Sequence, residues 1–198
     1  MSSQKWLFYR TACHKGAKKH KRVCKRACLP APIVNNGGGG TDVAIEVSAS
    51  ATTIVNGAPD TDVTYYAQVD PPIPATPTFS TAAVITGPVT LTSLDVTIDG
   101  LVASNLGATG YVGVAVFAQR GGAPPIERIT PYIVVAGAGA VPPTTAPNQW
   151  HLDLSPPIVL PASTNDIAVG ITLHSGSAAP PSMVVFTSLR AIVRGTSP

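Results

Sequence analysis

The stretch Tyr111-Val112-Gly113-Val114-Ala115-Val116-Phe117-Ala118-Gln119 shows the clearest alternation of side chains in the chain. Every second position from Val112 to Ala118 is apolar, which places these side chains on one face of an extended strand. Valine fits such a pleated, half-buried surface well because it is branched at Cβ. The stretch therefore predicts a β-strand with one face in a hydrophobic core.

Similar period-two segments lie on both sides of this stretch. We expect strands over residues 43–47, 51–55, 63–68, 78–85, 89–98, 128–135, 150–154, 167–173 and 183–193. Within 89–98 the apolar positions change phase between Leu91 and Leu94, which indicates a β-bulge near Thr92-Ser93. A second phase change separates Phe186 from Leu189. Asp99-Gly100 and several proline-rich segments mark the turns and loops.

The composition of residues 41–198 favours strands over helices. Ala, Val, Thr, Ile, Ser and Pro dominate it, and the chain contains 20 prolines and 18 glycines. Many short strands without helices must pack on one another as a sandwich, a barrel or a jelly roll. Long proline-bearing connections favour the last of these. We predict an all-β fold, an antiparallel β-sandwich of jelly-roll type, for the domain 41–198.

Residues 1–40 have a different composition and form a flexible basic N-terminal arm and linker in our interpretation. The basic residues are Lys5, Arg10, Lys15, Lys18, Lys19, Lys21, Arg22, Lys25 and Arg26. The first acidic residue is Asp42, and the rest of the chain sets four arginines against ten carboxylates. The arm therefore carries +9 and the body −6. Pro30, Pro32 and the glycines 37–40 indicate an extended, flexible connection.

A basic pole of this kind needs an acidic partner, because nine like charges in one short segment repel one another. Nucleic acid fits best, since Lys and Arg neutralise phosphates without reading the sequence. Trp6, Phe8 and Tyr9 can stack on unpaired bases. Two other partners stay open. One is the acidic body of a neighbouring subunit, and the other is an anionic membrane surface, which the run Trp6–Tyr9 beside the charges would suit.

All three cysteines, Cys13, Cys24 and Cys28, lie in the arm, so a disulfide cannot staple the core. The odd number leaves at least one thiol free or available for an interchain disulfide. His20, Cys24 and Cys28 are spaced by four residues, but the close Cys pairs of structural zinc sites are missing. We prefer the interchain disulfide or idle thiols.

Asp60 and Asp62, with Asp70 nearby, form an acidic loop in the body. Carboxylate oxygens suit a hard cation such as calcium, although solvated turn aspartates explain the same pattern. His151 and His174 are the only histidines of the body. Both fall at outward or strand-end positions of the predicted strands, where we expect surface polar residues.

The sequence lacks the motifs of the common enzyme classes. It contains no G-x-S-x-G, no H-E-x-x-H and no G-x-x-x-x-G-K-[ST], so we expect a protein that is not an enzyme and needs no cofactor apart from possible calcium. No apolar run reaches 18 residues, which argues against a membrane span. The apolar run 6–9 is too short for a secretory signal, so we expect synthesis in a cytoplasm.

The layout of a basic arm, a glycine-rich linker and a jelly-roll body of this length resembles the coat proteins of small icosahedral viruses. The arm here has more lysine than arginine and the body has few aromatic residues, which departs from that family. The resemblance implies a self-assembling capsid subunit of a virion, made in the host cytoplasm, whose partners are copies of itself and packaged nucleic acid. It also implies calcium at subunit contacts, carried by Asp60 and Asp62.

An alternative function belongs to a different class. In it the body is a jelly-roll subunit of an extracellular fibre or of a spore or cell surface layer. Cys13, Cys24 and Cys28 then crosslink neighbouring arms. The body with few charges favours this reading, whereas the length of the basic run disfavours it. Reducing and non-reducing gels separate the two.

Overall fold

The computed structural model describes residues 33–35, 41–67, 74–79, 81–121, 124–144, 146–177 and 179–198. Its strands are β1 (Ile33–Asn35), β2 (Thr41–Asn56), β3 (Thr61–Tyr66), β4 (Ala83–Thr86), β5 (Val89–Asp99), β6 (Val102–Ser104), β7 (Tyr111–Arg120), β8 (Ile126–Arg128), β9 (Ile133–Gly137), β10 (Gln149–Leu160), β11 (Thr164–Ser175) and β12 (Ser182–Ser197). The described residues contain no helix, and therefore none that is long and apolar enough to cross a membrane. The predicted all-β fold class is confirmed.

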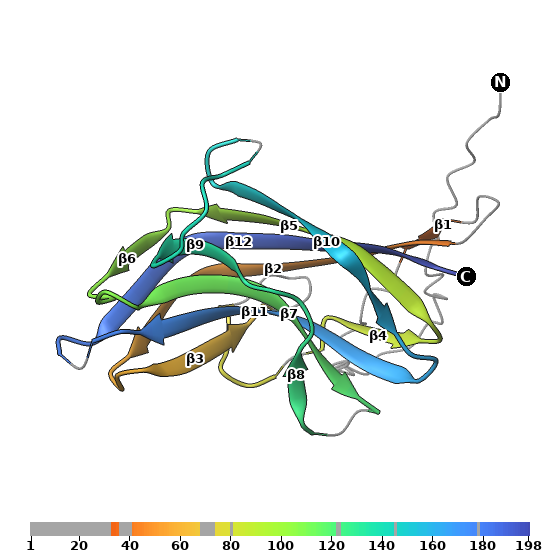
Figure 1. Ribbon diagram of the computed structural model, residues 1–198, viewed down its shortest axis with the longest axis horizontal. Coiled ribbons are helices and arrows are strands. Elements are labelled where there is room, and N and C mark those ends of the chain that lie inside the picture. Colours follow the sequence, from red (N-terminus) through yellow and green to blue (C-terminus); the bar gives the residue numbers. More distant parts are fainter. Residues whose placement is uncertain are drawn as a thin grey trace, which may run out of the picture.

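The strands form two antiparallel sheets, which Figure 1 shows as two layers. Sheet A has the order β1-β2-β12-β5-β10, with β6 also paired to β12, and sheet B has the order β3-β11-β7-β8, with β4 on β11 and β9 on β7. The eight main strands in chain order are β2, β3, β5, β7, β9, β10, β11 and β12. The first, eighth, third and sixth of them lie in sheet A, and the second, seventh, fourth and fifth lie in sheet B. This strand order is that of a jelly roll.

The core lies between the two sheets and follows the predicted alternation. Val112, Val114, Val116 and Ala118 of β7 are completely buried. The opposite face of β7 is buried as well, since Ala115 is inaccessible to solvent. The predicted apolar face of this strand is confirmed, and its other face is buried as well because aromatic side chains cover this part of sheet B.

The predicted bulge in the segment 89–98 is confirmed. In the pairing of β5 with β12, Arg194 faces Ser93 whereas the next residue, Gly195, faces Leu91, which leaves Thr92 as the extra residue. Leu91 and Leu94 are both fully buried. The bulge therefore lets two leucines with an odd spacing reach the same core.

Four predicted strands are joined, divided or shortened in the structure. The segments 43–47 and 51–55 form one continuous strand, β2, which pairs with β12 without a register shift although both strands change their buried face. The predicted strand 128–135 is split into β8 and β9 because Pro131, between them, has no N–H for a ladder. Of the predicted strand 78–85, only the last part belongs to a strand, β4.

The short strand β1 was not predicted. It pairs with the first residues of β2, with Ile33 opposite Ala44 and Asn35 opposite Asp42. The chain therefore joins the body at the β2 edge of sheet A. β2 begins at Thr41, directly after the glycines. The division into an arm, 1–40, and a domain, 41–198, stays a prediction because most of the arm lies outside the described residues.

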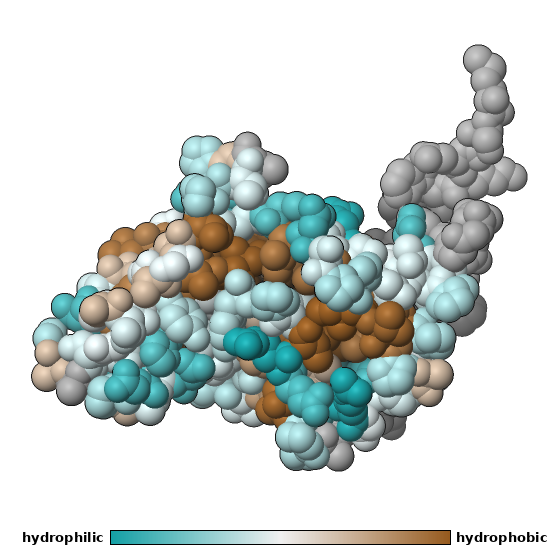
Figure 2. Space-filling model, viewed as in Figure 1, coloured by the Kyte–Doolittle hydropathy of each residue, from teal (hydrophilic) through white to brown (hydrophobic). Residues whose placement is uncertain are grey.

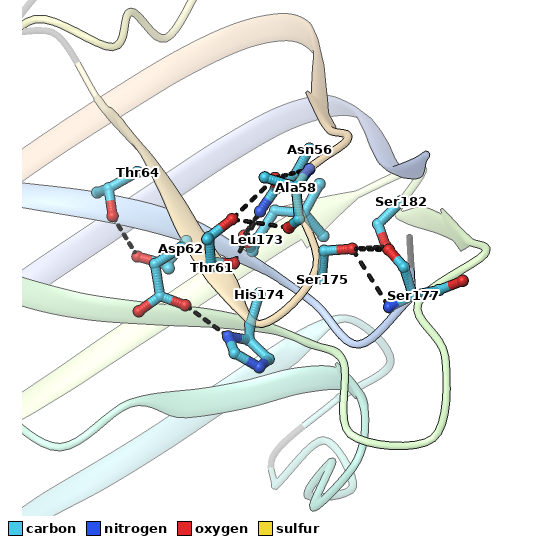
Figure 3. A network of polar contacts seen from close by, with 11 residues as sticks. Asn56, Ala58, Thr61, Asp62, Thr64, Leu173, His174, Ser175, Ser177 and Ser182 are labelled. Carbon is cyan, nitrogen blue, oxygen red and sulfur yellow. Dashed lines mark hydrogen bonds and ion pairs between the residues drawn. The ribbon is translucent and has the colours of Figure 1, made fainter. Parts of the chain in front are cut away.

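One end of the sandwich is held by a polar network at the β2–β3 and β11–β12 connections (Figure 3). The buried Asn56 donates to the carbonyl oxygens of Thr61, at 2.8 Å, and Leu173, at 3.1 Å. The hydroxyl groups of Ser175 and Ser182 lie 2.8 Å apart. These bonds satisfy buried polar groups where β2, β3, β11 and β12 end or begin, which fixes the loops at this end.

Candidate functional site

The predicted nucleic-acid-binding residues and the three cysteines lie outside the described residues. This applies to Lys5, Arg10, Lys15, Lys18, Lys19, Lys21, Arg22, Lys25 and Arg26, and to Cys13, Cys24 and Cys28. Their roles stay predictions. The structure shows where the segment that carries them is attached, namely at β1 on the edge of sheet A.

Asp60 and Asp62, the two aspartates predicted to bind calcium, make different contacts in the structure. Asp60 lies in the turn before β3, has φ 54°, and its backbone N–H donates to the Ser175 carbonyl at 2.7 Å. Asp62 points to the His174 ring instead, with Oδ1 2.8 Å from Nδ1 (Figure 3). In the described ranges no group of three or more His, Cys, Asp or Glu side chains is arranged to hold a metal ion. Calcium at Asp60 and Asp62 stays a prediction.

His174 heads a row of rings on the outer face of sheet B. Its ring stacks on Tyr111, with centroids 4.9 Å apart and planes 15° apart. Tyr111 contacts Tyr132 at 5.7 Å, and the Arg128 guanidinium lies 4.2 Å from the centre of the Tyr132 ring. Ring contacts and a cation–π contact of this kind stabilise by about 0.5–1.5 kcal/mol each.

The row continues into a small second apolar cluster on the same face. Tyr66 packs edge-on against Phe79 at 5.2 Å and against Phe117 at 5.5 Å. Gly170 makes room for Phe117, because a Cβ on this glycine would lie 2.8 Å from the Phe117 ring. Burial is the largest cause that raises the pKa of Tyr66. These aromatic side chains cover sheet B in the place of a third layer.

The sequence contained a signal for this cluster that its interpretation missed. Tyr111, Ala115 and Phe117 occupy the positions of β7 that alternate with the core valines. An aromatic residue on the face expected to meet solvent indicates a second buried surface. His174 was expected to be a surface polar residue, whereas its side chain is only 21% exposed and lies between Asp62 and Tyr111.

The outer face of sheet A is polar and charged. His151 of β10 bridges two carboxylates, with Nδ1 2.6 Å from Asp95 and Nε2 2.9 Å from Asp153. Arg194 of β12 donates from Nε to the second oxygen of Asp95 at 3.0 Å. On the same face Arg190 donates to Glu46 at 2.6 Å, and this hydrogen bond lowers the pKa of Glu46. The four strands of this face are thus linked by ion pairs across them.

The protonation of His151 is coupled to its two carboxylates. The hydrogen bond with Asp95, followed by that with Asp153, raises the pKa of His151. Burial is the largest influence on the pKa of Asp95 and would raise it, but the hydrogen bonds from His151 and Arg194 together bring it below its ordinary value. The charged forms of both groups are therefore favoured in the folded protein.

This coupling gives a prediction for pH dependence. A histidine with a raised pKa contributes stability that is complete below its unfolded pKa of about 6.5 and is lost as the pH rises through its folded pKa. The free energy of unfolding should therefore fall as the pH rises from about 6.5 through the raised folded pKa of His151, by less than about 1 kcal/mol because the site is exposed. His151→Gln should remove this part of the decrease in urea denaturation. Identical pH profiles of wild type and variant would refute the coupling.

An apolar patch, defined by Val55, Val102, Met183 and Val185, lies at one end of the outer face of sheet A. Val55 is paired with Met183 across β2 and β12, and Val185 is paired with Val102 across β12 and β6. Val55, Met183 and Val102 are 51%, 36% and 61% exposed. Figure 2 shows apolar surface over β6. Neighbouring exposed apolar side chains of this kind are typical of contact surfaces between proteins.

Comparison with known proteins finds little. The chain matches no protein-family profile and no curated protein. Among solved structures it is similar to the crystal structure of the infectious bursal disease virus VP2 subviral particle, with a TM-score of 0.29 and 10% sequence identity. The match covers 84% of this chain and 47% of that chain, so this chain spans about half of its length. A similarity of this size does not establish a shared function.

Proposed function

We propose that the protein is a self-assembling shell subunit, a capsid or coat protein of a virion, whose arm binds the packaged nucleic acid without sequence specificity. One observation carries the proposal: an acidic jelly-roll body of net charge −6 receives, at one edge of one sheet, a segment of net charge +9. In an assembly of about 60 copies, the arms would supply roughly 540 positive charges. This charge neutralises several hundred nucleotides.

Two features of the body support self-assembly. The edge strand β10 of sheet A carries Pro156 and Pro157, which have no N–H for a further strand, so this edge resists open-ended pairing. The apolar patch offers a defined contact instead. In this proposal the protein is not an enzyme, and the two His–Asp pairs, Asp62–His174 and Asp95–His151, are structural.

The apolar patch gives the test of self-assembly. A carboxylate at Val102 would be desolvated without a partner in a subunit contact, so Val102→Asp should abolish assembly. The melting temperature should stay close to that of the wild type, because the side chain is 61% exposed in the single subunit. Sedimentation velocity measures the assembled fraction.

The matched control is Val159→Asp. Val159 of β10 is 66% exposed and is paired with Thr90 of β5, which in turn is paired with Thr196 of β12. Thr196 is eleven residues from Val185 along β12. Val159 is thus about 35 Å along the strands from Val185. We expect this variant to assemble as the wild type does. Normal assembly of Val102→Asp would contradict a role for the patch.

A further inference from the structure

The outer face of sheet A carries a net negative charge and lies beside the attachment point of the arm. Its carboxylates are Asp42, Glu46, Asp95, Asp99 and Asp153, and its guanidinium groups are Arg190 and Arg194. Five acidic and two basic groups give −3 with His151 neutral, which is half of the −6 counted for the body on the same basis. The charged form of His151, which its two carboxylates favour, reduces this to −2.

Two of these carboxylates are paired with guanidinium groups and a third, Asp153, with the His151 ring. Arg190 binds Glu46 and Arg194 binds Asp95. Asp153 of β10 is paired with His151, and Asp99 of β5 accepts a hydrogen bond from the Ser188 hydroxyl at 2.6 Å. Within the described part of the face, Asp42 of β2 and Asp99 are therefore the carboxylates that lack an ionic partner. The side chain of Asp153 is 84% exposed and contacts His151 through one oxygen. A cation that approaches this face finds free carboxylate oxygens on three different strands.

The side chains between the carboxylates are short and polar. Ser48 and Ser50 of β2, Ser188 of β12 and Thr97 of β5 occupy outward positions of the face. Hydroxyl oxygens accept hydrogen bonds from ammonium and guanidinium groups. Long basic side chains can therefore lie flat on this part of the sheet, whereas the apolar patch is confined to the other end.

The pairing of β1 fixes where the arm joins sheet A. Ile33 is opposite Ala44, two residues from Glu46, so the chain enters β1 beside the charged part of β2. Arg26 lies seven positions before Ile33, so the backbone between them spans about 24 Å when extended. The four strand spacings from β1 to β10 cover about 19 Å. The segment 5–26 can therefore reach every carboxylate of the face.

We infer that the basic segment 5–26 docks on the outer face of sheet A of its own subunit and that nucleic acid displaces it. The tether makes docking intramolecular, with an effective concentration in the millimolar range. A strand of DNA carries about one charge every 3.4 Å, far denser than three carboxylates on a whole sheet face. A polyanion therefore wins the competition, and without it the arm is held on the body. This regulation rests on the proposed function of the arm.

The first test compares two double variants of the full chain with equal changes in net charge. Asp42→Asn with Asp153→Asn removes free carboxylates from the face. Asp60→Asn with Asp166→Asn removes two carboxylates elsewhere, at the turn before β3 and on β11 of sheet B. Affinity is measured for an oligouridylate of about 20 nucleotides at low salt.

The variant Asp42→Asn with Asp153→Asn lacks part of the competing site for the arm. Its affinity for the oligouridylate should therefore be at least about threefold higher than that of the variant Asp60→Asn with Asp166→Asn. Equal affinities of the two variants would overturn the docking, because the effect would then be one of net charge. Melting curves check that both variants fold.

The second test does not depend on nucleic acid binding. Ser48→Cys places a thiol on the outer face of sheet A, and Ser163→Cys places one in the loop between β10 and β11. The described residues contain no natural cysteine, whereas Cys24 and Cys28 lie in the arm. Diamide oxidises two close thiols to a disulfide. We expect Cys24 or Cys28 to be trapped faster in the Ser48→Cys protein, within one subunit, and more slowly at high salt.

Equal trapping rates for the two positions would overturn the docking, and a disulfide-linked dimer as the main product would overturn docking within one subunit. The two proposals can fail separately. Trapping at Ser48→Cys without any binding of the oligouridylate would retain the docking and refute the function of the arm. Binding of the oligouridylate without trapping would refute the docking and retain the function of the arm.

Discussion

Gly110→Ala should lower the free energy of unfolding by about 3 kcal/mol or more, or prevent folding. A Cβ at this position would overlap the carbonyl oxygen of Leu106 and lie 2.9 Å from the backbone nitrogen of Gly176. Both groups belong to backbone that is already hydrogen-bonded, since Gly176 N–H donates to the Leu106 carbonyl at 2.8 Å. The clash cannot be relieved by a side-chain rotation, so the loops between β6 and β7 and between β11 and β12 must separate.

Gly57→Ala is the matched control for this prediction. Gly57 also lies in a loop and has no positive φ, but the nearest atoms to its Cβ would be those of Pro181 at 3.9 Å. The substitution should change stability by less than about 1 kcal/mol. Urea denaturation of both variants measures the difference. Equal stabilities would show that the close approach of the two loops is not required.

Neutralising four arm residues should greatly weaken the binding of single-stranded RNA. The variant carries Lys18→Gln, Lys19→Gln, Lys21→Gln and Arg22→Gln, which reduces the arm charge from +9 to +5. Each phosphate contact adds about −0.7 to the slope of log affinity against log salt for single strands. The slope should change from about −6 to about −3.5, and the affinity at physiological salt should fall by more than about tenfold.

A charge-preserving variant separates charge from side-chain identity. Lys18→Arg, Lys19→Arg, Lys21→Arg and Arg22→Lys keep +9, and contacts to phosphates carry no sequence information. This variant should retain the wild-type slope. An unchanged slope in the neutralised variant would show that RNA is not bound through these residues.

The fold could be predicted from the sequence to a large extent because the core follows local alternation. The valines of β7 and the phase change around Leu91 and Leu94 each appear in the sequence as a pattern of a few residues, and each is found in the structure. The break at Pro131 was visible too, as a residue without an N–H, but the apolar residues on both sides of it concealed the break. The sheet order, by contrast, depends on pairings between distant strands.

The surfaces of the body could not be predicted in the same way. The contact of His174 with Asp62 joins residues 112 positions apart, and that of His151 with Asp95 joins residues 56 positions apart. Both depend on which strands are neighbours, which local periodicity does not contain. The apolar patch likewise needs β2, β12 and β6 side by side. The charge difference between arm and body was visible from composition, but the attachment through β1 was not.

Nuclease protection of assembled particles tests most directly whether this protein encloses nucleic acid. Particles of the wild-type protein, isolated by sedimentation from the cells that make it, are treated with nuclease, and the nucleic acid that remains is quantified. We expect nucleic acid that resists the nuclease and cosediments with spherical particles, and a strong loss of it when Lys18, Lys19, Lys21 and Arg22 are neutralised. Particles free of nucleic acid at low salt, or nucleic acid fully digested on intact particles, would contradict the account.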